Sequence, residues 1–159
     1  MRSSRILGID PGFGRMGFGC ISVVRGKTHA LDFGVVTTSA NEPMGDRLLA
    51  LFDDMGELVE QLQPNVIAVE KLFFAKNTTT ALRVAESRGI VLLLAARAGI
   101  PVIEVGPSQV KLAVAGDGTA DKAAMQRMVA RLLGLPRVPK PDDAADALAI
   151  AITASTMRF

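Results

Sequence analysis

The chain has 159 residues, of which 49% are hydrophobic and 21% charged, so we expect one folded domain over residues 1–159 rather than a disordered chain. The single cysteine, Cys20, excludes an internal disulfide, and the single histidine, His29, excludes a multi-histidine zinc site. The formal net charge is only +2, but residues 71–140 carry eleven Lys or Arg against four Asp or Glu. This basic segment could bind a polyanionic ligand, or its basic residues could simply lie on exposed helix faces.

The first part of the chain predicts three strands followed by a helix. Apolar or β-branched runs cover residues 5–10, 17–24 and 28–38, with short turns between them, which is typical of an antiparallel meander. Pro43 opens the helix, and Asn41 is a candidate cap. One face of this helix is apolar: Leu48, Leu51, Phe52, Met55, Leu58, Val59 and Leu62.

The rest of the chain alternates between strands and helices. Strands are expected at 65–70 and 102–105, with a long helix at 78–98 between them. Helices follow at 107–114, from a cap at Thr119 to Gly134, and at 142–156. This order predicts an α/β fold, in which helices cover both faces of a mixed five-stranded sheet. No segment resembles a signal peptide or a membrane span, so we expect a cytoplasmic protein without membrane contact.

Acidic residues stand where predicted elements begin or end. Asp10 and Glu70 each follow four apolar residues, where a buried strand should emerge at the edge of the sheet. Asp143 and Asp146 are three residues apart near the start of the last helix, so they share a helix face. Asp142 falls on a different face and is better explained as a helix cap. Each residue alone would be read as a turn or cap residue, but the set together favours a shared site.

Four converging carboxylates would repel one another unless cations joined them. Ligand sets of oxygen atoms alone select Mg²⁺, or Mn²⁺ as a substitute. Two such ions about 4 Å apart could stabilise the attacking and leaving oxygens of a phosphoryl displacement. We therefore expect Asp10, Glu70, Asp143 and Asp146 to be both catalytic residues and metal ligands.

Two loops are also distinctive. Residues 11–19 are rich in glycine and could cradle a phosphate as in actin-like ATPases, although a tight hairpin connection is the favoured interpretation. Residues 71–77 place Phe73 and Phe74 in a basic loop. One of these rings could stack on an unstacked base, on a partner subunit or on the core of the domain.

Three motifs together resemble the RuvC-type Holliday junction resolvases, also called crossover junction endodeoxyribonucleases. They are Ile-Leu-Gly-Ile-Asp-Pro-Gly at 6–12, Val-Glu-Lys-Leu-Phe-Phe-Ala-Lys-Asn at 69–77, and Asp-Asp-Ala-Ala-Asp-Ala-Leu-Ala-Ile-Ala at 142–151. The motifs occur in the order and spacing of that family and cover nearly the whole chain. One motif alone would indicate only the broader ribonuclease H-like group.

The resemblance implies a ribonuclease H-like nuclease domain that resolves four-way DNA junctions by paired symmetric nicks in recombination and repair. It implies a Mg²⁺-dependent homodimer with the four carboxylates as catalytic residues. It also implies a branch-migration complex of RuvA- and RuvB-type proteins as partners. Expected DNA-binding residues are Phe73, Phe74, Lys76, Lys111 and Lys122.

The 78–98 helix gives separate support for a dimer, because Ile90 to Leu94 make it apolar around most of its circumference. A two-fold partner could cover one side, or the helix could be sandwiched inside the domain.

Two other functions are weighed against the nuclease. An actin-like phosphotransferase would need a second domain, for which this chain is too short. A DNA-binding module without catalysis would gain nothing from clustered negative charge.

Overall fold

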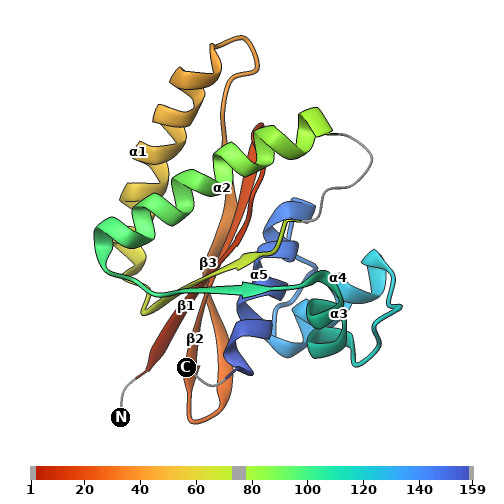
Figure 1. Cartoon of the computed structure of the whole chain (residues 1–159). Helices are drawn as coiled ribbons and strands as arrows, with labels where there is room; N and C mark the ends of the chain where they lie inside the picture. Colours follow the sequence, from red (N-terminus) through yellow and green to blue (C-terminus); the bar gives the residue numbers. More distant parts are fainter. Residues whose placement is uncertain (1–2, 73–77, 158–159) are drawn as a thin grey trace.

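The computed structural model describes residues 3–72 and 78–157 and contains a mixed five-stranded sheet with the strand order β3-β2-β1-β4-β5 (Figure 1). Strands β1 (Ser4–Asp10), β2 (Arg15–Val24) and β3 (Lys27–Thr37) form the predicted antiparallel meander. Arg25 and Gly26 make the turn between β2 and β3 with positive φ angles of 51° and 77°. Strands β4 (Val66–Glu70) and β5 (Val102–Val105) then run parallel to β1.

Helices cover both faces of this sheet, as predicted. Helices α1 (Met44–Leu62) and α2 (Thr78–Ala98) connect the later strands and pack together on one face. Helices α3 (Pro107–Ala115), α4 (Lys122–Leu132) and α5 (Asp142–Ser155) lie on the other face, with α5 directly against the sheet (Figure 1). Ten residues of α5 are buried, because small alanine side chains let this helix sit between the sheet and its neighbours.

The core divides into two clusters that follow the alternation of the strands. On β1, Leu7 and Ile9 belong to the cluster under α1 and α2, whereas Ile6 belongs to the cluster under α5. On β4, Ile67 and Val69 face α1 and α2 in the same way, and Ala68 faces α5. Because side chains alternate between the two faces, these positions also show which face of the sheet the last residue of each strand points to.

Two predicted helix caps are wrong. Pro43, not Asn41, is the N-cap of α1, and its fixed ring geometry begins the helix without a side-chain hydrogen bond. Helix α4 begins at Lys122 rather than near Thr119, because the Asp121 carboxylate accepts the Ala124 amide at 2.7 Å. Thr119 instead donates its hydroxyl to Asp117 in the preceding loop.

Helix α2 is not sandwiched inside the fold. Val91, Leu94 and Ala95 are buried, but Leu82 and Leu93 are 59% and 56% exposed. The interpretation that the molecule itself covers both sides of this helix is therefore wrong for the described residues. In the described part of the chain, no helix is long and apolar enough to cross a membrane.

Candidate active site

Strands β1 and β4 place two carboxylates on the same face and at the same edge of the sheet. Asp10 follows Ile6 and Gly8 at alternate positions, so its side chain leaves β1 on the side of α5. Glu70 follows Ala68 on the same side of β4. The parallel register pairs Gly8 with Ala68 and Ile9 with Val69, which brings the two carboxylate positions side by side.

Glycines on β1 and β2 let α5 approach the sheet closely enough to complete the site. A Cβ on Gly8 would lie 2.1 Å from the backbone oxygen of Ala147, and one on Gly17 would lie 2.1 Å from that of Asp143. No real Cβ tolerates such distances, so these positions require glycine. The backbone of α5 therefore lies on that of the sheet, which brings Asp143 and Asp146 to the end of β1.

The result is a cluster of three carboxylates. Asp10, Asp143 and Asp146 each offer an oxygen atom within 4.8 Å of the others, which is a geometry that could hold a metal ion. Glu70 is not in this group, but it lines one cavity with Asp146 and another with Asp10. The structure thus brings together the predicted set of four, with Glu70 at its margin.

The electrostatics of the cluster favour a bound cation. Burial, followed by the charges of Asp146, Asp143 and Glu70, raises the pKa of Asp10 to about 7. Burial also raises the pKa of Glu70 and of Asp146, with like charges in the cluster adding to the effect. A divalent cation would remove this repulsion and keep the carboxylates ionised.

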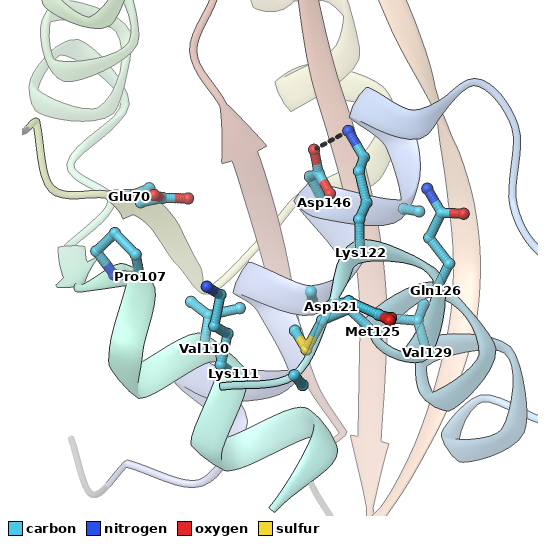
Figure 2. A pocket seen from close by; sticks show the side chains of 13 residues that line it. Glu70, Pro107, Val110, Lys111, Asp121, Lys122, Met125, Gln126, Val129 and Asp146 are labelled. Carbon is cyan, nitrogen blue, oxygen red and sulfur yellow. Dashed lines mark ion pairs between the residues drawn. The ribbon is translucent and has the colours of Figure 1, made fainter. Parts of the chain in front are cut away.

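Two lysines stand beside the cluster at the predicted positions. The Lys122 ammonium lies 3.8 Å from a carboxylate oxygen of Asp146, and this charge is the main reason that the pKa of Lys122 is raised. Lys111 lies on α3 and lines the same cavity as Glu70 (Figure 2), and its positive charge offsets part of the rise in the pKa of that carboxyl group. Both lysines therefore face the acidic residues, from α3 and from the start of α4.

Comparison with known proteins assigns the family. The family model for the crossover junction endodeoxyribonuclease RuvC matches residues 6–154. The chain belongs to the RuvC family. It is 52% identical over 152 residues to RuvC of Roseiflexus sp. (strain RS-1), an alignment that covers 96% of this chain and 90% of the relative. It is also 54% identical over 150 residues to RuvC of Thermomicrobium roseum, and this alignment covers 93% of this chain and 90% of the relative.

Solved structures agree with this assignment. T. thermophilus RuvC in complex with a Holliday junction substrate superposes with a TM-score of 0.89 at 39% identity, over 94% of this chain and 92% of that one. The predicted ribonuclease H-like fold and the RuvC-type resemblance are both confirmed, and with them the class of enzyme, a crossover junction endodeoxyribonuclease.

Sequence reasoning missed Arg15 as a member of this RuvC-type site. Its guanidinium Nε lies 3.1 Å from a carboxylate oxygen of Asp143. Arg15 stands two residues before Gly17, which pairs with Asp10 in the sheet, so it projects on the face that α5 covers. The placement of Arg15, Gly17 and Gly19 at alternate positions could have indicated that they share one face of a strand. A segment so rich in glycine is, however, more readily interpreted as a loop.

Asp142 was predicted to cap α5, and this is wrong. Pro141 is the N-cap, without a side-chain hydrogen bond, and Asp142 is the first residue of the helix. The Asp142 carboxylate lies 3.4 Å from the Lys122 ammonium and accepts the Gln126 amide at 3.0 Å. These hydrogen bonds, that of Lys122 first, hold the pKa of Asp142 below its usual range. Asp142 therefore ties α5 to α4 and orients Lys122.

The glycine-rich loop is the favoured hairpin connection, since β2 begins at Arg15 and pairs with β1. The carbonyl of Phe13 accepts hydrogen bonds from Arg47 at 2.9 Å and from Thr38 at 2.8 Å, which anchors the loop to α1 and to the end of β3. Phe73, Phe74 and Lys76 lie outside the described residues, so their predicted contacts with DNA stay predictions.

Proposed function

We propose that Asp10, Glu70, Asp143 and Asp146 form the metal centre with which this chain hydrolyses phosphodiester bonds at four-way DNA junctions. The observation that supports the proposal best is the three-carboxylate cluster at the meeting point of β1 and α5, in a chain of the RuvC family. We further propose Mg²⁺, in two ions per site, with Mn²⁺ as a substitute. When bound, the ions would activate water and stabilise the leaving oxygen.

Different side chains of the site would bind the metal ions, bind the phosphate and hold these groups in position. Asp10 lies between the strand-borne and the helix-borne carboxylates and is electrostatically coupled to all three, so it is the natural shared ligand. Lys111 and Lys122 would hold the scissile phosphate and balance its negative charge. Asp142 and Gln126 orient the helix start from which Lys122 projects. Each of these tasks needs a side chain held by a helix or strand rather than by a mobile loop.

Membership of the family supports the proposed substrate and partners. T. thermophilus RuvC has been captured with a Holliday junction substrate, and this chain matches that protein over nearly its full length. Paired symmetric nicks need two active sites related by a two-fold axis, which a homodimer supplies. The exposed Leu82 and Leu93 on α2 are an apolar surface that such a dimer would bury. RuvA- and RuvB-type proteins remain the proposed branch-migration partners.

The substitution Asp10→Asn tests the assignment of the centre. It keeps the size of the side chain but removes the charge that a metal needs, so cleavage of a four-way junction should fall by about 10³-fold or more. Junction binding in an electrophoretic shift assay should persist, because the basic residues are unchanged. Cleavage at the wild-type rate by this variant would show that the metal centre is assigned wrongly. Unchanged wild-type binding without any cleavage in Mg²⁺ would instead favour a DNA-binding module.

A further inference from the structure

The side chain of Arg83 on α2 lies over the ring of Phe13 in the loop between β1 and β2. The guanidinium carbon is 5.4 Å from the ring centroid, which is within the range of a cation–π contact. Arg47 approaches the same ring to 5.5 Å and donates a hydrogen bond to the Phe13 carbonyl at 2.9 Å. Arg47 is only 6% exposed, so Phe13 is held from inside the fold. The ring in turn fixes the position of Arg83, which is exposed.

Two positive charges therefore meet at Phe13, and among the described residues no carboxylate forms an ion pair with either of them. The remaining segments, 1–2, 73–77 and 158–159, contain no Asp or Glu. Like charges that lie close together without a counter-ion repel each other. A planar guanidinium on an aromatic ring can still donate two parallel hydrogen bonds to a phosphate. The unbalanced charge at Phe13 thus favours an anionic ligand at the exposed arginine.

Arg83 also adjoins the carboxylate cluster. Its neighbour Val84 lines a cavity of about 260 Å³ together with Asp10 and Glu70. Phe13 comes three residues after Asp10, so the ring that Arg83 contacts belongs to the same edge of the sheet. Each nucleotide of a DNA strand carries a phosphate. A strand whose scissile phosphate lies at the carboxylates therefore brings a neighbouring phosphate past this guanidinium.

The position of Arg83 on α2 separates it from the leucines of the proposed dimer surface. Arg83 stands about 100° around the helix from Leu82, which is 59% exposed. Ser87, one turn along the same helix face as Arg83, is fully buried, and its hydroxyl donates to the Arg83 carbonyl at 3.2 Å. Arg83 thus continues the buried face of α2 to the point where that face leaves the core at the edge of the sheet.

We propose that Arg83 binds a backbone phosphate next to the scissile phosphate in the DNA strand that is being cut, with Phe13 as its positioning residue. The proposal rests on the nuclease function above and adds a cation on the α2 side of the carboxylates. Lys111 and Lys122 stand on the other side, on α3 and α4. The strand would thus be held on both sides of the bond that is broken. A phosphate contact contributes affinity and register rather than a preference for certain bases.

The salt dependence of junction binding tests this contact without cleavage. The wild-type protein and Arg83→Gln bind a four-way junction in EDTA, and Kd is measured between about 50 and 200 mM salt. Each lost phosphate contact lowers the slope of log Kd against log salt concentration by about 0.9. We expect Arg83→Gln to show this lower slope and, at the lowest salt, about three- to tenfold weaker binding. The factor should be the same for junctions of different sequence.

Arg97→Gln is the matched control. Arg97 is also an exposed arginine of α2, and its guanidinium carbon lies 5.5 Å from the centroid of the Phe52 ring. It stands 14 residues further along the helix than Arg83, which is about 21 Å. It lines a cavity with three acidic residues, Asp53, Glu57 and Glu60. Loss of this arginine should leave both the slope and the affinity unchanged.

Two further variants separate a phosphate contact from packing. Arg83→Lys keeps the charge but not the planar group, so it should restore the slope and only part of the affinity. Phe13→Leu removes the ring, so it should weaken binding by the otherwise wild-type protein but have little further effect in Arg83→Gln. Circular dichroism checks the fold of each variant. If Phe13→Leu fails to fold, the comparison of Arg83→Gln with Arg83→Lys decides.

The proposal is overturned if Arg83→Gln keeps the wild-type slope, if Arg97→Gln lowers the slope equally, or if Arg83→Lys does not restore it. A change in the sedimentation of Arg83→Gln would place Arg83 in an interface between subunits and would also overturn it. Cleavage by the wild-type protein is measured in parallel with Mg²⁺. An unchanged slope with normal cleavage would remove the contact at Arg83 and leave the nuclease function intact. Absence of wild-type cleavage would count against the nuclease itself.

Discussion

Asp10 is the residue on which the site depends most, because it is the carboxylate most disturbed by its neighbours. Its pKa of about 7 results mainly from burial and then from three nearby acidic side chains. Without a cation, this carboxylate must either bind a proton or remain in an unfavourable charged state. Local destabilisation in the absence of a cation is therefore the expected consequence of the proposed metal centre.

The pH dependence of stability should reveal this cost. Between pH 4 and 7 the folded protein holds a proton on Asp10 that the unfolded chain, with a pKa near 3.8, has released. The free energy of unfolding in EDTA should therefore fall as the pH rises through this window. Asp10→Asn does not titrate there, so it should be the more stable protein at pH 8, by up to about 4 kcal/mol, and lose this advantage near pH 4.

Urea titrations of both proteins across this pH range measure the difference. Mg²⁺ provides a control, because it should stabilise the wild-type protein at pH 8 far more than the variant. A stability difference that does not change with pH would mean that Asp10 titrates normally.

Arg15 gives a second prediction at this scale. Its guanidinium competes with a cation for Asp143, from which it lies 3.1 Å away. Arg15→Gln should lower the Mg²⁺ concentration for half-maximal cleavage by about two- to fivefold, a small factor because the Arg15 side chain is largely exposed. Initial rates over a Mg²⁺ series give this value, and Arg25→Gln in the β2–β3 turn is the control. An unchanged or raised Mg²⁺ requirement would contradict the competition.

Among the elements, the contact between α5 and the first two strands is what assembles the site. The helix carries two of the four carboxylates, and it reaches the sheet because Gly8 and Gly17 have no Cβ in its way. The alanines of α5 complete the fit, since larger side chains would hold the helix away. The position of the carboxylate cluster, the proposed metal centre, is thus a consequence of backbone-to-backbone packing.

Gly8→Ala tests this packing. The new Cβ would lie 2.1 Å from the Ala147 carbonyl, so α5 or β1 must shift, and we expect a loss of about 3 kcal/mol or more in stability together with loss of cleavage. Gly45→Ala in α1 is the matched control, because its Cβ meets nothing within 4 Å. It should be neutral or slightly stabilising. Equal effects of the two substitutions on unfolding in urea would refute the account.

The sequence was sufficient to predict the elements, the mixed sheet and the placement of the acidic residues at one edge of the sheet, since these depend on local patterns. Strand periodicity and the turn at Pro11 locate Asp10, and the same logic locates Glu70. The Asp142 prediction failed because its partners Lys122 and Gln126 lie 20 and 16 positions away in the chain. Arg15 was missed for a related reason, since its ion pair depends on how α5 crosses the strands. Contacts that arise from tertiary packing leave no local signal.

For the whole molecule, the central feature is that the acidic cluster and the exposed leucines of α2 lie on opposite faces of the sheet. The α5 face carries the acidic cluster. Lys111, Lys122 and the cavity that they line lie on the same face (Figure 2). The opposite face carries α1 and α2, and α2 exposes Leu82 and Leu93. A dimer formed through α2 would leave the catalytic face of each subunit open to DNA.

Leu93→Glu tests this arrangement. A buried carboxylate would disrupt an interface through α2, so sedimentation should change from a dimer to a monomer while the fold is retained. Leu112→Glu is the control, because Leu112 is similarly exposed, at 61%, but lies on α3. Paired nicking of junctions should decline with the dimer. A variant that still sediments as a dimer would place the interface elsewhere.

The most direct test of the central claim is cleavage of a four-way junction and of a linear duplex with the same sequence, in Mg²⁺ and in EDTA. If the carboxylate cluster is the metal centre of a junction-selective nuclease, Mg²⁺ should give symmetric nicks in two strands of the junction, little cutting of the duplex, and no cutting of either in EDTA. Equal cutting of junction and duplex, or cutting that persists in EDTA, would contradict it.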